Sequence, residues 1–152
     1  VFEASFRLSN ELWRAIDTEH DARIKAEAEL DAKDKKRNVK AAIGRYIDIG
    51  NKLFRSCGGN DGNDLHKKEP AEAWVTDSHR FVIAAFGSGE GELLLSDVGY
   101  TFYSGDGLVG NWVKGRIKRL TELIVRVDSL DVDRAFDPVS WPSSQLNKVD
   151  GA

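Results

Sequence analysis

Apolar residues in the first part of the chain recur at helical spacing. Between Phe2 and Ile43 there is no glycine and no proline, the residues that most often interrupt a helix. A first apolar stripe is followed by a strongly charged stretch and then by a second stripe. The stripes consist of Phe2, Phe6, Trp13, Ile16 and His20, and of Val39, Ile43, Tyr46, Ile47, Leu53 and Phe54. This pattern predicts a helical region over residues 1–57.

Two arrangements fit this helical region. Residues 22–36 are rich in Ala, Glu and Lys, and Glu29 precedes Lys33 by four positions, which is the order that stabilises a helix. One arrangement is a single long helix, with or without a kink. The other is a hairpin broken near residues 34–38, with Asn38 capping the second helix. Because no turn dipeptide marks a break, we favour the single helix.

The pattern changes after a polar, glycine-containing stretch at residues 58–70. Segments 73–76, 80–86, 92–95 and 100–103 resemble strands, with Asp77-Ser78 and the glycine-rich stretch 87–91 between them. Short connections imply antiparallel neighbours. The run from Phe81 to Phe86 is apolar on both faces, which predicts the most buried strand. We therefore predict a small antiparallel sheet of three to four strands.

Helical spacing returns at Leu108. Steps of four and three residues form a heptad-like seam, which consists of Val113, Ile117, Leu120, Ile124 and Val127. Pro138 and Pro142 predict an irregular tail from about residue 137, which Trp141 would hold against the body. The expected fold is a single α+β domain over residues 1–152. Its parts are a long N-terminal helical region, an α+β body over residues 71–152 and an amphipathic C-terminal helix.

Composition and charge narrow the classes of partner. The net charge of −3 gives no general affinity for nucleic acid or acidic membranes. No stretch approaches the roughly 20 apolar residues of a membrane span, and the first residues lack the pattern of a signal peptide. The single cysteine, Cys57, cannot form an internal disulfide, which is typical of a reducing compartment. We expect a cytoplasmic protein that does not contact a membrane.

One glycine motif could bind an anion. Gly105, Gly107 and Gly110 have the Gly-x-Gly-x-x-Gly spacing of dinucleotide-binding turns, and Asp128 follows at the place of the ribose-binding acid. Too few residues follow Asp128 to build further βαβ units, and the helical seam runs through the region where the next strand would lie. A weaker form is a glycine turn whose helix N-terminus offers N–H groups to some anion. We favour simple turn and capping glycines.

Two groups of basic residues could bind nucleic acid. The nucleic-acid candidates are Arg45, Lys52 and Arg55 in the first group and Lys114, Arg116, Lys118 and Arg119 in the second. If both groups faced one side, they could neutralise several phosphates. Acidic residues interrupt or flank both groups, so we favour ordinary solvated helix faces.

Side chains suited to catalysis or metal binding are scattered. Cys57, His66, Asp77 and His79 show no local arrangement of a nucleophilic site. The polar residues 60–64 lack the ligand spacing and closing glutamate of an EF-hand. We therefore predict no catalytic residue, no metal site and no cofactor.

The long charged helix leads to a hypothesis about function. Such a helix cannot be stabilised by its own core along its whole length, and tertiary or partner packing normally supplies the missing burial. The first hypothesis is a non-enzymatic, cytoplasmic regulatory or protein-interaction protein that forms homo-oligomers through helices, as coiled coils do. The alternative is a nucleic-acid-binding regulator that uses the basic groups. A third hypothesis is a nucleotide-binding protein that uses the turn at Gly105–Gly110.

Overall fold

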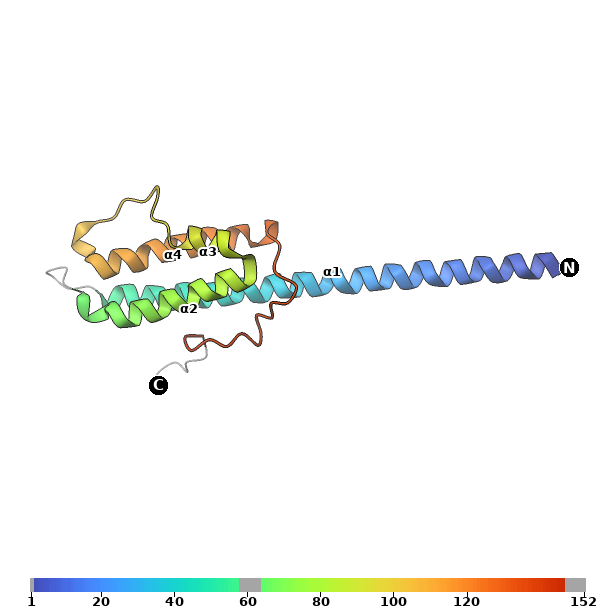
Figure 1. Cartoon of the computed structure of the whole chain (residues 1–152), viewed down its shortest axis with the longest axis horizontal. Coiled ribbons are helices and arrows are strands. Elements are labelled where there is room, and N and C mark those ends of the chain that lie inside the picture. The colour runs from blue at the N-terminus through green and yellow to red at the C-terminus, as the bar shows by residue number, and fades with distance from the viewer. Residues whose placement is uncertain (1, 58–63, 147–152) are drawn as a thin grey trace. The chain divides into compact units, whose positions relative to one another are not determined.

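The computed structural model of this chain describes residues 2–57 and 64–146, and their side chains from residue 7 onward. Over these residues it contains four α-helices and no β-strand (Figure 1). The helices are α1 (Phe2–Ser56), α2 (Lys68–Phe86), α3 (Ser88–Leu94) and α4 (Leu108–Arg126). Short 3₁₀ turns lie at Leu65–Lys67, Ser104–Asp106 and Val127–Ser129.

The chain divides into two compact units, Val1–Asp34 and Lys35–Ala152. The first unit is the N-terminal part of α1, and residues 7–33 are all solvent-exposed. The second unit contains the remainder of α1, the other three helices and the hydrophobic core. Residues 34–38, where a hairpin would break the chain, are helical. The helical region predicted near the N-terminus therefore forms one continuous helix, α1.

The predicted α+β fold is wrong, because three of the four proposed strands lie wholly or mostly in helices. Segments 73–76 and 80–86 both belong to α2, residues 92–94 belong to α3, and residues 100–103 have no regular structure. The buried positions of α2 follow the helical period: they are Ala71, Trp74, Val75, Asp77, Ser78, Phe81, Val82 and Ala85. A short apolar run such as 81–86 fits a buried strand and a buried helical turn equally well. The expectation of a sheet depended on that ambiguity.

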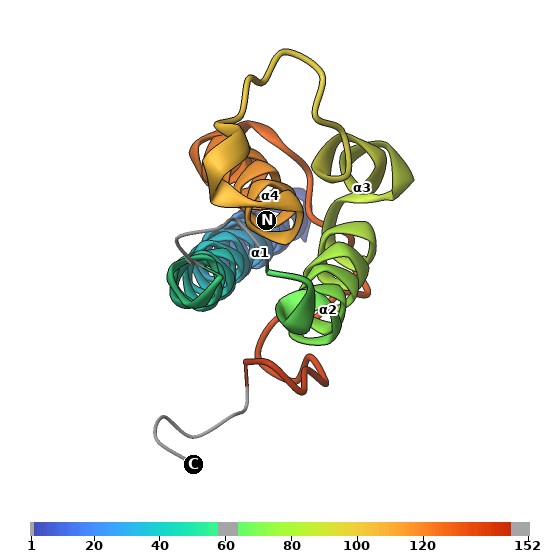
Figure 2. The same cartoon turned by 90° about the vertical axis from the view of Figure 1, so that its left-hand side faces the viewer.

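Trp74 lies in the core of the second unit. Its side chain is fully buried, and its indole N–H donates a 3.0 Å hydrogen bond to the backbone oxygen of Tyr46. A Cβ atom at Gly50 would overlap the Trp74 ring, so glycine at this position lets α1 and α2 approach closely. Figure 2 shows α1, α2 and α4 beside one another in this unit, with α3 next to α2.

The C-terminal segment 130–146 is irregular and packs on the helices through aromatic rings. The Trp141 ring lies 5.9 Å from the Phe81 ring and 5.5 Å from the Phe136 ring, measured between centroids. Both contacts belong to one aromatic cluster that links α2 to the segment. Trp141 thus lies where the sequence places it, between the tail and the body.

A buried carboxylate joins three parts of the second unit. Asp77 on α2 accepts a 2.8 Å hydrogen bond from the Tyr46 hydroxyl on α1 and another from the Ser143 hydroxyl in the C-terminal segment. Burial raises the pKa of Tyr46, so this hydroxyl keeps its proton and remains a donor. Both hydroxyl groups donate to Oδ2 of a carboxylate that is only 6% exposed, which offsets part of the cost of burying it.

The apolar seam of α4 is covered within the second unit. Val113, Leu120 and Val127 are fully buried, and Ile117 and Ile124 pack half-buried against the same core. The seam therefore needs no second chain to cover it. Any association between chains has to use another surface.

Candidate functional site

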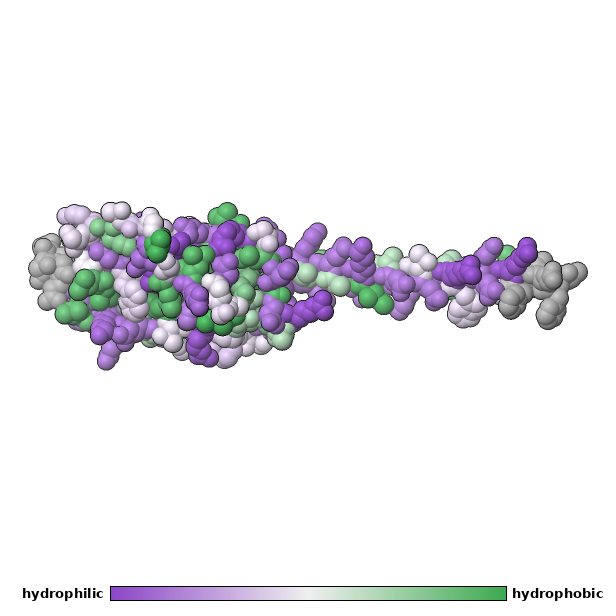
Figure 3. All heavy atoms as spheres, turned by 45° about the horizontal axis from the view of Figure 1, so that its top comes forward, coloured by the Kyte–Doolittle hydropathy of each residue, from purple (hydrophilic) through white to green (hydrophobic). Residues whose placement is uncertain are grey.

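A group of exposed apolar side chains lies on residues 7–33 of α1, a segment on which every residue is exposed. Six large apolar side chains there are between 45% and 68% exposed: Leu8, Leu12, Trp13, Ile16, Ile24 and Leu30. At 100° per residue they occupy roughly 160° of the helix circumference, which is less than half of it. We call these six residues the exposed stripe. Figure 3 shows hydrophobic side chains among hydrophilic ones along this part of the molecule. Phe2 and Phe6, which the sequence placed on a related stripe, have side chains outside the described residues.

Charged residues along the same segment alternate in blocks. Acidic residues at positions 17, 19 and 21 precede bases at 23 and 25, and acids follow at 27, 29 and 31. Glu19 and Arg23 form an ion pair of 3.4 Å within the helix, with side chains 73% and 67% exposed. A pair this exposed contributes little to the stability of the isolated helix. Both residues thus stay accessible to a partner.

The glycine motif forms the turn into α4. Gly107 has φ +79° and ψ 167°, a conformation that is essentially confined to glycine, and Gly105 lies in the preceding 3₁₀ turn. The first turn of α4 already binds a carboxylate. Asp64, 1% exposed, accepts hydrogen bonds from the backbone N–H groups of Val109 at 3.2 Å and Gly110 at 2.6 Å. Two of the N–H groups that could receive an external anion are therefore bonded to a side chain of the protein.

Asp128 lies beyond the other end of α4. The 19 residues of this helix span roughly 28 Å at 1.5 Å per residue, so Asp128 is not near the glycine turn. Its carboxylate instead pairs with Lys40 at 2.7 Å. The structure does not bring Asp128 together with Gly105, Gly107 and Gly110.

The side chains of the second basic group contact residues 95–106, which lie between α3 and α4. Lys114 pairs with Asp106 at 3.5 Å, and Arg116 pairs with Asp97. Arg119 donates hydrogen bonds to the backbone oxygens of Ser96 and Val98. The Lys118 ammonium lies 5.1 Å from the Tyr100 ring centroid. All four basic side chains thus have partners inside the second unit.

The basic residues between positions 35 and 55 of α1, which include the first basic group, divide into two sets. Lys35 and Lys36 donate hydrogen bonds to the backbone oxygens of Arg134 and Asp128, respectively. Lys40 forms an ion pair with the Asp128 carboxylate. The nucleic-acid candidates Arg45, Lys52 and Arg55 are exposed on α1, at helical spacing that puts them on one face. Lys52 and Arg55 also line an open depression of about 340 Å³.

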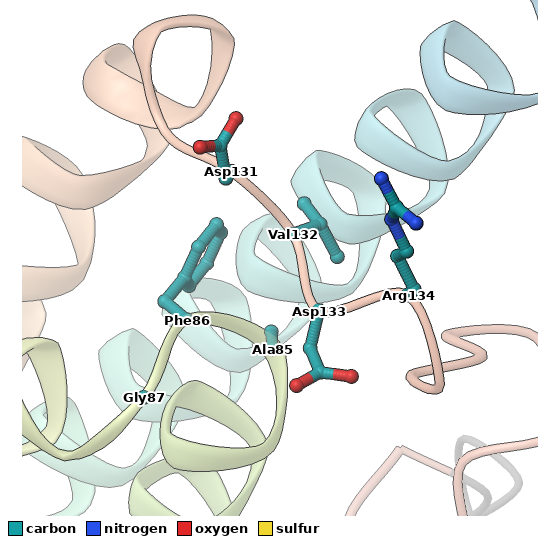
Figure 4. A pocket seen from close by; sticks show the side chains of 7 residues that line it. All are labelled: Ala85, Phe86, Gly87, Asp131, Val132, Asp133 and Arg134. Atoms are coloured by element: carbon teal, nitrogen blue, oxygen red, sulfur yellow. The ribbon is translucent and has the colours of Figure 1, made fainter.

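A further open pocket of about 460 Å³ lies between the end of α2 and residues 131–134 (Figure 4). Its lining includes Phe86 and Val132, with Asp131 and Asp133 beside them. In Figure 4 the two carboxylates point in opposite directions. The Asp133 carboxylate also accepts a 2.8 Å hydrogen bond from the backbone N–H of Ala135. The carboxylates therefore do not converge as a pair of catalytic acids would.

Sequence reasoning did not identify Asp64 as a capping residue. An N-cap normally lies next to its helix in the chain, and the local signal is Ser, Thr, Asp or Asn directly before the first turn. Asp64 reaches the first turn of α4 from the other side of two intervening helices. Only the tertiary structure reveals this contact.

Comparisons with protein-family models, curated proteins and solved structures give no match. In the part of the chain that the structure describes, no helix has both the length and the apolar character needed to cross a membrane. The case for a function therefore depends on the chain's own surfaces, of which the exposed stripe gathers six exposed apolar side chains on one helix.

Proposed function

We propose that this chain is a non-enzymatic protein-interaction protein that associates with a second copy of itself through the exposed stripe. The observation that supports this function is a helical segment, residues 7–33, on which every residue is exposed although six large apolar side chains share one side. Water is an unfavourable environment for such a surface, and a partner helix is a common cover. A regulatory role in the cytoplasm accords with a single, buried, unpaired cysteine at Cys57.

The energy available favours weak association. Full burial of one large aliphatic side chain is worth ~1.5–3 kcal/mol. Because the stripe residues are about half exposed, covering all six on two copies provides at most about 9–18 kcal/mol. Loss of translational and rotational freedom opposes association by ~4–15 kcal/mol. We therefore expect a dimer with a dissociation constant on the order of micromolar.

The experiment is sedimentation equilibrium of the full chain over roughly 1–200 µM, a range that brackets a micromolar dissociation constant. The unchanged chain is expected to shift from monomer to dimer across this range. The variant Leu12→Glu/Ile16→Glu changes two exposed positions and is expected to stay folded but monomeric. A matched control, Val98→Glu/Val139→Glu, alters two apolar residues of the second unit that are about 80% exposed and should still dimerise.

Two results would contradict the proposal. One is a monomer for the unchanged chain at every concentration. The other is equal dimerisation of the unchanged chain and the Leu12→Glu/Ile16→Glu variant, which would place the contact elsewhere. Circular dichroism at 222 nm checks that each variant keeps its helix content.

A further inference from the structure

A heptad seam in the first unit is complementary to itself when reversed. Steps of four and three residues place six exposed positions on one side of α1: Leu12, Ile16, Glu19, Arg23, Ala26 and Leu30. The order is apolar, apolar, acidic, basic, small, apolar. When a second copy runs in the opposite direction, each apolar position faces an apolar or small residue, and the acidic position faces the basic one. We call these six residues the reversible seam.

From this order we infer that two copies of the chain pair antiparallel along the reversible seam, centred on Asp21. The inference rests on the proposed self-association and specifies its geometry, with Leu12, Ile16 and Leu30 as the residues of the exposed stripe that form the contact. In this register Leu12 faces Leu30 of the second copy, and Ile16 faces Ala26 of the second copy. Glu19 faces Arg23 of the second copy, and two-fold symmetry repeats every contact once.

The apolar layers fit by size. Leu12 and Leu30 are 62% and 60% exposed, so a leucine-to-leucine layer at each end of the seam removes apolar surface from water on both copies. Ile16 meets the small Ala26, and alternation of large and small side chains lets facing helices interdigitate. Ile16, 45% exposed, is thus covered without crowding the helix axes.

The charged layer selects the direction. Glu19 and Arg23 already lie within 3.4 Å of each other on one helix. In the antiparallel pair, two glutamates and two arginines alternate around the centre, and each charge has opposite charges as neighbours. A parallel, in-register pair would instead place Glu19 against Glu19 and Arg23 against Arg23. Like charges at facing positions are unfavourable, and charged or polar layers in coiled coils specify register and orientation for this reason.

The flanking positions accord with this geometry. Ala22 lies beside the centre of symmetry, where the two copies of the same residue approach each other, and its small side chain leaves room for close packing. Asp17 and Lys25 lie on the opposite side of the helix, at positions away from the pairing surface. Their charges should therefore have little influence on pairing.

The test uses two single charge reversals in the full chain. Glu19→Arg puts an arginine opposite Arg23 of the second copy, and Arg23→Glu puts a glutamate opposite Glu19 of the second copy. Each variant alone is expected to dimerise at least tenfold more weakly than the unchanged chain. An equimolar mixture of the two variants should recover the affinity. In the mixed dimer, each arginine of one copy faces a glutamate of the other. Sedimentation equilibrium of each variant and of the mixture measures this.

Matched controls separate position from net charge. Asp17→Arg changes the net charge as Glu19→Arg does, and Lys25→Glu changes it as Arg23→Glu does. Both controls should dimerise within about twofold of the unchanged chain, because their side chains lie away from the seam. If they weaken dimerisation as much as the seam variants, net charge rather than the seam governs pairing, and the inference is overturned.

The remaining outcomes distinguish this inference from the proposed function. If the unchanged chain dimerises but both seam variants dimerise equally well, the register is wrong and self-association stands. If the single variants are weakened and their mixture does not recover, Glu19 and Arg23 do not face each other across the pair, and the inference is overturned. If the unchanged chain is monomeric throughout, the proposed function fails together with the inference.

Discussion

Replacing Asp64 by alanine tests how the helices of the second unit are held together. The carboxylate is 1% exposed and accepts hydrogen bonds from the N–H groups of Val109 and Gly110, at 3.2 and 2.6 Å. N–H groups in the first turn of a helix have no partner within the helix. Asp64→Ala therefore removes both bonds and leaves two donors that the fold shields from water.

The expected loss can be built from these two bonds. Loss of an N-cap costs about 0.5–2 kcal/mol, and a buried donor left without a partner costs about 1–3 kcal/mol. Because the space vacated by the carboxylate can admit water, we expect a total loss of roughly 2–4 kcal/mol in the free energy of unfolding. Asp64→Asn keeps one acceptor oxygen and should lose about half as much.

Urea unfolding followed by circular dichroism measures the change, with Asp131→Ala as the control. Asp131 is exposed, so its removal should alter the free energy of unfolding by less than about 0.5 kcal/mol. A loss below about 0.5 kcal/mol for Asp64→Ala would refute the reasoning, because two buried bonds cannot be that weak. The same unfolding experiment can be repeated with inorganic phosphate in the buffer. If phosphate raises the free energy of unfolding of Asp64→Ala but not of the unchanged chain, the glycine turn can receive an external anion.

Two further substitutions test single residues. Gly107→Ala should lower the free energy of unfolding by about 1–3 kcal/mol, because φ +79° with ψ 167° strains any residue that has a Cβ atom. Gly44→Ala is its control in urea unfolding, since a Cβ atom there meets nothing within 4 Å, and it should be neutral or stabilising. Burial and the hydrogen bond to Glu122 raise the pKa of Tyr100 to about 12, so its neutral form favours the folded state. This contribution is fully present below pH 10 and is lost as the pH rises from 10 towards 12, whereas Tyr100→Phe should lack that dependence and one ionisation at 295 nm. An unchanged absorbance titration in Tyr100→Phe would contradict the assignment.

The sequence alone predicted the helical character of α1 and α4, although it left open whether α1 is one helix or a hairpin. The absence of glycine and proline from Phe2 to Ile43 and the apolar period after Leu108 are local signals, and α1 and α4 form where those signals lie. Helical hydrogen bonds join residues four apart, so a pattern within one segment is sufficient to predict them. The irregular C-terminal segment was predictable for the same reason, because its prolines act locally.

Only the tertiary structure decided the state of residues 73–86. Asp77 and Ser78 resemble a turn in sequence, but both are buried within α2. Asp77 is tolerated there because Tyr46 and Ser143, from distant parts of the chain, donate hydrogen bonds to it. No window of the sequence around α2 contains those donors.

The same separation explains the candidate sites. The sequence identifies which residues carry charge, but whether a charge is available depends on what folds against it. Arg116 looks available in the sequence and is buried against Asp97 in the structure. The exposed stripe shows the converse case: its apolar residues are visible in the sequence, and only the fold shows that nothing described in the first unit covers them. Helices form from contacts between near neighbours in the chain, whereas burial and pairing depend on contacts between residues far apart in it, which is why the tertiary structure decided them.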